Sequence, residues 1–105
     1  MATSKDTIEY ILEALGDRQR FTSRAMFGEY ALYADGKVVG LVCNDLLYVK
    51  ILSASAELEG ECEKDYPYLG AKLYYVVDEG MVVDMENLPG ILIKVAESLP
   101  EKKKK

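Results

Sequence analysis

Four polar residues with the types that a small-ligand site would use recur near the ends of predicted strands. They are Arg24, Asp45, Tyr48 and Lys50. Gathered at one end of a sheet, they would serve an enzyme or a small-ligand-binding domain. Their spacing matches no catalytic motif, so this hypothesis stays an alternative to a non-enzymatic role.

The sequence lacks most of the residues that common catalytic and metal sites need. It contains no histidine, which removes Ser–His and Cys–His pairs and histidine metal sites. Cys43 lies in an apolar strand, which favours a packed thiol over a nucleophile. Cys43 and Cys62 form no CxxC pair, and no secretion signal precedes them, so we expect two reduced thiols in the cytoplasm. We therefore predict no enzyme, no catalytic residue, no cofactor and no metal.

Length and charge limit the domain count and the partners. With 105 residues the chain fits one domain, which we place at 1–101, followed by a disordered lysine tail at 102–105. The net charge is −5, and residues 51–100 carry three basic and ten acidic side chains. This balance opposes direct binding of nucleic acid. The alternating acids over 57–65 favour a solvated loop rather than a cation site. No apolar stretch is long enough to span a membrane.

Eight tyrosines are many for this length. Five of them lie on predicted strands: Tyr30, Tyr33, Tyr48, Tyr74 and Tyr75. One interpretation is an aromatic platform for single-stranded nucleic acid, used together with Arg18, Arg20 and Arg24. The favoured interpretation is packing within a half-buried sheet, since aromatic residues suit strands and the charge is acidic.

Hydrophobic periodicity predicts an α+β fold in which an antiparallel meander packs against amino- and carboxy-terminal helices. A helix over 4–15 begins at Thr3 or Ser4 and ends at Gly16. Strands follow over 24–34, 37–43 and 46–52, the first with a bend or bulge at Gly28. A short helical segment starts at Ser53, and a fourth strand covers 72–77. The last helix carries an apolar stripe over 88–99 and ends at Pro100.

Two turns set the register of the meander. Asp35-Gly36 is typical of a two-residue hairpin, which places Tyr33 opposite Val38, Leu32 opposite Val39 and Tyr30 opposite Leu41. The second turn leaves two alternatives. A loop of Asn44-Asp45 alone places Tyr48 opposite Leu41, whereas one more residue places Val49 there and moves Tyr48 to the other face.

With the short second loop, both faces of the meander are apolar. One face carries Tyr33, Val38, Val42, Leu47, Val49 and Ile51, and the other carries Tyr30, Leu32, Val39, Leu41, Cys43 and Tyr48. Two helices cover one face only, and an uncovered apolar face normally marks a partner surface. We therefore predict a homodimer with Tyr30, Leu41 or Tyr48 in or near its interface. The full candidate interaction surface is Arg24, Tyr30, Leu41, Asp45, Tyr48 and Lys50.

Nearly the whole chain also resembles, in order, one family, the TfoX amino-terminal domain, and the first block of residues is the most specific part of the match. The matching residues are Arg24, Met26-Phe27-Gly28, Tyr30, Leu32-Tyr33, Asp35-Gly36, Asp45, Leu47-Tyr48 and Lys50, then Tyr74-Tyr75-Val76 and a terminal amphipathic helix. Some members carry glycine where Glu29 and Ala31 stand, and proline often follows the Tyr-Tyr strand where this chain has Val77-Asp78.

This resemblance implies a fold and a biological context, and it implies no catalytic residue. The fold is an α+β domain similar to secretion chaperones. The context is kinship with bacterial regulators of competence and DNA transformation, which act in transcription regulation and carry a second, carboxy-terminal domain. Because the sequence ends at Lys105, we expect no such second domain and only a weak transfer of the competence role. The function expected is a cytoplasmic interaction module that acts through protein contacts.

Overall fold

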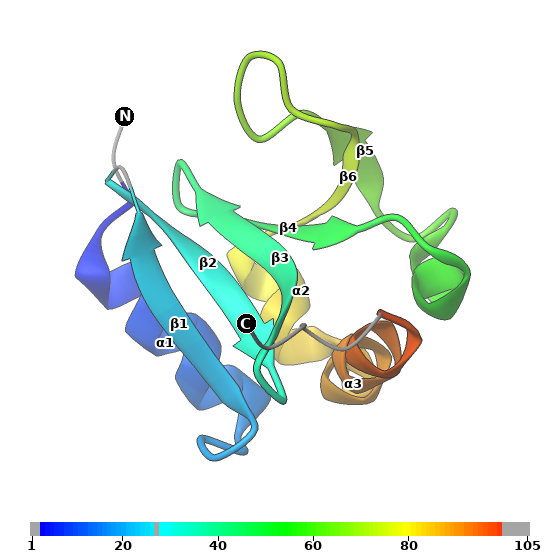
Figure 1. Cartoon of the computed structure of the whole chain (residues 1–105), viewed down its shortest axis with the longest axis horizontal. Coiled ribbons are helices and arrows are strands. Elements are labelled where there is room, and N and C mark those ends of the chain that lie inside the picture. The colour runs from blue at the N-terminus through cyan, green and yellow to red at the C-terminus, as the bar shows by residue number, and fades with distance from the viewer. Residues whose placement is uncertain (1–2, 27, 100–105) are drawn as a thin grey trace, which may run out of the picture.

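The computed structural model describes residues 3–26 and 28–99 and has the predicted α+β architecture (Figure 1). Within these residues the strands form one six-stranded antiparallel sheet in the order β1-β2-β3-β4-β6-β5. The elements are α1 (Lys5–Leu15), β1 (Phe21–Met26), β2 (Glu29–Ala34), β3 (Lys37–Cys43), β4 (Leu46–Lys50), η1 (Ser53–Leu58), β5 (Glu63–Asp65), β6 (Tyr74–Val77), α2 (Glu79–Asp84) and α3 (Leu88–Ser98). The predicted lysine tail at 102–105 lies outside the described residues.

The first helix begins and ends as the sequence predicts. The Ser4 hydroxyl accepts a hydrogen bond from the Thr7 N–H, which caps the first turn. Gly16 follows the last turn with φ 96°, a conformation that glycine adopts without strain. The apolar stripe is buried at Ile8, Ile11, Leu12 and Leu15.

The single long strand predicted over 24–34 is wrong, because this segment contains a hairpin turn. Met26 pairs with Glu29, and Gly28 has φ 82° at the turn between β1 and β2. A glycine inside an apolar run predicts either a bend or a reversal, and here the chain reverses. The sheet therefore gains an edge strand, β1, which begins at Phe21.

A β-bulge in β3 overturns part of the predicted register. Tyr33 pairs with Val38 as predicted, but Leu32 pairs with Gly40 and Tyr30 with Val42. The ladder shifts between Leu32 and Tyr33, so β3 holds one residue more than β2 over this stretch. The face assignment changes accordingly. Leu32 and Val39 lie in the helix-covered core with Tyr30 packed against it, whereas Tyr33 packs on the opposite face.

The second turn takes the shorter of the two alternatives. Asn44 and Asp45 both have positive φ, 52° and 62°, as a two-residue hairpin turn requires. Cys43 then pairs with Leu46, and Leu41 with Tyr48.

The second half of the chain contains two elements that the sequence analysis does not predict. The acidic stretch includes a short exposed edge strand, β5, which pairs with β6. A two-turn helix, α2, follows β6, and the Asp78 carboxylate caps it by accepting from the Met81 N–H. The last helix, α3, has Pro89 in its first turn as predicted.

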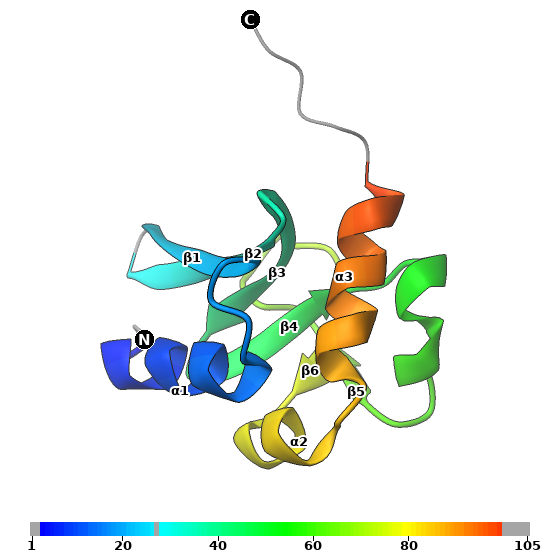
Figure 2. The same ribbon diagram turned by 90° about the horizontal axis from the view of Figure 1, so that it is seen from below.

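The three helices cover one face of the curved sheet (Figure 2). The main core joins the apolar faces of α1 and α3 to residues of every strand from β1 to β4 and of β6, among them Phe21, Leu32, Val49 and Tyr75. A smaller cluster lies on the opposite face and contains Ala31, Leu41, Cys43 and Tyr48. Among the helices of residues 3–26 and 28–99, none is long and apolar enough to cross a membrane.

Candidate functional site

The sheet brings together three of the six candidate surface residues in one row. Arg24 pairs with Ala31, Ala31 with Leu41, and Leu41 with Tyr48, so these side chains share the face opposite the helices. Lys50 lies on the same face, two residues beyond Tyr48 at the end of β4. Tyr30 and Asp45 do not join this row.

Asp45 has a structural role at the far end of β4 from Lys50. Its carboxylate accepts hydrogen bonds from the Ser4 N–H at 3.0 Å and from the Thr7 hydroxyl at 2.8 Å. These two bonds hold the pKa of Asp45 below its usual value. The predicted ligand site of Arg24, Asp45, Tyr48 and Lys50 at one end of the sheet is therefore wrong, because β4 separates Asp45 from Lys50.

Thr3 and Glu29 extend this polar cluster at the start of the chain. The Thr3 hydroxyl donates to Glu29 Oε1 at 2.5 Å and accepts from the Asp45 N–H at 3.2 Å. The same Glu29 oxygen accepts from the Asn44 N–H at 3.2 Å. The cluster thus fastens the beginning of α1 to the β3–β4 turn and to the first residue of β2.

The face opposite the helices is not open, contrary to the expectation of an uncovered apolar patch. Leu41 is 5 % exposed and Tyr48 is 4 % exposed. Residues 66–71 line a hollow beside Asn44, and residues 68 and 70–74 line another beside Lys50. The β5–β6 loop therefore runs along β4 on this face. The sequence does not predict this covering role, because the tyrosines and glycine of the segment show no periodicity.

Neither cysteine has the environment of a reactive thiol. Cys43 and Cys62 are both unpaired and buried, and they lie in the two different core clusters. Burial raises the pKa of Cys43 to about 11, with a further contribution from the negative charge of Glu29. Burial also raises the pKa of Cys62. Both groups are thus held as neutral thiols.

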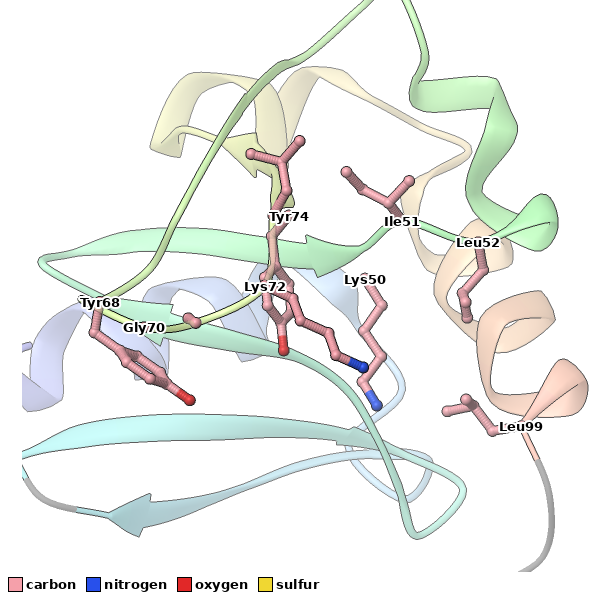
Figure 3. Close-up of a pocket in the computed structure, with 10 residues that line it drawn as sticks. Lys50, Ile51, Leu52, Tyr68, Gly70, Lys72, Tyr74 and Leu99 are labelled. Carbon is pink, nitrogen blue, oxygen red and sulfur yellow. The ribbon is translucent and has the colours of Figure 1, made fainter.

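A groove at the end of β4 is lined by two basic side chains (Figure 3). It measures about 580 Å³, and Lys50, Lys72, Tyr68 and Tyr74 line its polar part. Lys50 pairs with Tyr74 across the β4–β6 ladder. The apolar part is formed by Ile51, Leu52, Leu73 and Leu99. Of these residues, only Lys50 belongs to the interaction surface predicted from the sequence, and Tyr74 was noted only as a strand tyrosine and family residue.

The loop between β5 and β6 is also the most exposed apolar segment. Its backbone forms the wide loop at the top of Figure 1. Leu69 is fully exposed, Tyr66 and Tyr68 are each 57 % exposed, and Leu73 is 40 % exposed. The aromatic and aliphatic residues of this loop could have identified it from the sequence, because turn segments rarely expose such side chains together.

No cluster of three or more His, Cys, Asp or Glu residues with metal-binding geometry occurs in the part of the chain that the structure describes. Two of the five acids over 57–65, Glu57 and Glu59, form ion pairs instead. Lys64 lies 2.8 Å from Glu59, and Lys94 lies 2.5 Å from Glu57. The Tyr75 hydroxyl also donates to Glu59, at 3.0 Å.

The fold and surface define a small α+β domain whose antiparallel sheet is covered by helices on one face and by a loop on part of the other. The family model described as TfoX N-terminal domain matches residues 13–96, and the chain belongs to this family. The chain is also 37 % identical over 103 residues to the "uncharacterized 12.7 kDa protein in trpE 5′ region" of Spirochaeta aurantia. That similarity covers 98 % of this chain and 89 % of the relative.

Proposed function

We propose that the protein is a non-enzymatic interaction module, related to competence regulators, that acts through protein contacts in transcription regulation. The observation that carries the proposal is the β5–β6 loop, which places Tyr66, Tyr68, Leu69 and Leu73 on the surface. Exposed aromatic and aliphatic side chains in one short segment are typical of protein-binding surfaces. Membership of the TfoX N-terminal family supports the regulatory context.

The side chains of the site support binding more than catalysis. The two cysteines are buried with raised pKa values, so neither supplies a thiolate at neutral pH. Asp45 is engaged by Ser4 and Thr7, so its carboxylate already holds the start of α1. Acid–base catalysis needs a donor and an acceptor that converge on one reacting atom.

A photo-crosslinking residue at position 69, in the full chain expressed in its own organism, tests the proposal. Position 83 is the matched control, because Val83 is 55 % exposed on α2, away from the loop. We expect a discrete protein adduct from position 69, which Leu73→Asp weakens and which position 83 does not give. The absence of an adduct at position 69, or the same adduct from both positions, contradicts the proposal.

A second copy of the chain is the first partner to test, because the sequence predicts a homodimer. With Leu41 and Tyr48 buried, the loop is a better candidate interface than the face of the sheet. Sedimentation equilibrium at tens of micromolar protein should give twice the monomer mass of 11.7 kDa. Leu69→Asp should shift the equilibrium toward monomer and Val83→Asp should not. A monomer mass for the unmodified chain excludes the homodimer.

A further inference from the structure

Some basic side chains of this acidic protein form ion pairs or hydrogen bonds, and others form no ion pair. Arg18, Arg20, Lys64 and Lys94 form ion pairs with carboxylates. Lys37 donates to the Ala96 and Leu99 carbonyl oxygens, each at 3.1 Å, at the end of α3. Within residues 3–26 and 28–99, the remaining basic residues with no ion pair are Lys5, Arg24, Lys50 and Lys72.

Two of these four unpaired cations, Lys50 and Lys72, line the same groove. Among the described residues that line it, none carries a carboxylate. Two ammonium groups that line one hollow both attract an anion placed between them. The groove therefore favours negative ligands even though the whole chain is acidic.

The groove has a polar side and an apolar side. Figure 3 shows the amines of Lys50 and Lys72 and the hydroxyl of Tyr74 directed to the same region. Burial raises the pKa of Tyr74, which keeps its hydroxyl a hydrogen-bond donor at neutral pH. The side chains of Leu52 and Leu99 border the groove near these amines, and its volume of about 580 Å³ suits a small organic molecule.

We propose that this groove binds a small organic anion with an apolar body. Its carboxylate or phosphate group would lie between the amines of Lys50 and Lys72, and its body would contact Leu52 and Leu99. This site goes beyond the proposed protein contacts, because the anion needs no partner protein. Lys72 and Tyr74 belong to the segment that follows the exposed loop, so an occupied groove would also order the carboxyl end of that loop.

Amide chemical-shift titration of the full chain tests the proposal with four probes. Phenyl phosphate and phenylacetate carry both features, inorganic phosphate carries only the charge, and benzyl alcohol carries only the apolar body. We expect saturable shifts around Lys50, Lys72 and Tyr74 with the first two probes. The expected dissociation constant is about 1 mM, which is ordinary for ligands of this size. The tighter of the two probes identifies the preferred anionic group.

Neutral substitutions provide the decisive comparison. Lys72→Gln alters an exposed residue outside the strands, so the fold should be retained, and it should weaken phenyl phosphate binding by about tenfold. Lys5→Gln removes the same charge from α1 and should leave binding unchanged. Equal weakening by both variants, no saturable shift with either full probe, or equally tight binding of inorganic phosphate or benzyl alcohol would overturn the proposal.

Discussion

Asp45 illustrates how a residue that resembles a ligand-binding group serves a turn instead. Its type and its place beside a strand end suggest a functional carboxylate. In the structure its carboxylate accepts hydrogen bonds from the Ser4 N–H and the Thr7 hydroxyl at the start of α1. Sequence spacing cannot reveal this role, because the contact joins residues 38 and 41 positions apart.

We expect Asp45→Asn to make the stability of the protein less dependent on pH. The folded-state pKa of Asp45 lies below its ordinary value of 3.8, so ionised Asp45 stabilises the fold above that pH. This contribution is lost as the pH falls through the folded-state pKa. Urea unfolding of both proteins between neutral pH and acid should show a difference at neutral pH that shrinks below pH 3.8. Asparagine tolerates the positive φ of this position, so the turn itself is preserved. A difference that is constant over the whole pH range contradicts this role.

Helices, strands and turns also show which features a local sequence pattern can predict. Helical stripes and two-residue turns follow from local spacing, so α1, α3 and both turns of the β2–β3–β4 meander are predicted correctly. The bulge in β3 is not predicted, because composition alone does not show whether Val38 or Val39 is the extra residue. The hairpin at Gly28 and the helix α2 were missed because each is too short to show a recognisable hydrophobic periodicity.

Gly40, which follows the bulge, should tolerate no side chain. A Cβ atom there would lie 2.3 Å from the Tyr48 carbonyl oxygen, a backbone atom of β4 that cannot rotate away. We expect Gly40→Ala to lower the free energy of unfolding by about 1–3 kcal/mol, the usual cost of overpacking. Gly80→Ala is the matched control, since its nearest neighbour is 3.5 Å away and alanine favours helices. Chemical denaturation measures both, and an equal effect of the two variants refutes the close approach of β3 and β4.

The packing of α3 gives a second prediction at the scale of elements. Leu92 has no exposed surface and lies in the main core. We expect Leu92→Ala to destabilise the protein by about 2–5 kcal/mol, through lost burial and the cavity that remains. Val83→Ala, at a 55 % exposed position on α2, should change the stability by less than about 0.5 kcal/mol. A small loss at Leu92 in thermal or urea unfolding would mean that α3 does not pack as described.

At the scale of the whole molecule, the net charge follows from the sequence alone, whereas the covering of the second sheet face depends on the three-dimensional fold. Net charge is a sum over residues, so the sequence alone establishes it. The covering of the second face depends on where the β5–β6 loop lies, and no local pattern in residues 66–73 specifies that position. The sequence therefore predicts an acidic α+β domain correctly but wrongly expects an open apolar face at Leu41 and Tyr48.

The acidic balance leads to a prediction about nucleic acid. The net charge is −5, and four of the 13 basic side chains are the lysines at 102–105. Arg18 and Arg20 are paired with carboxylates, so they offer little to phosphate. In fluorescence anisotropy with single- and double-stranded oligonucleotides, we expect no micromolar binding at physiological salt. Replacing Lys102–Lys105 by glutamine should abolish any weak binding that appears at low salt. Micromolar affinity that survives this replacement and falls steeply with added salt would instead favour a nucleic-acid surface on the folded domain.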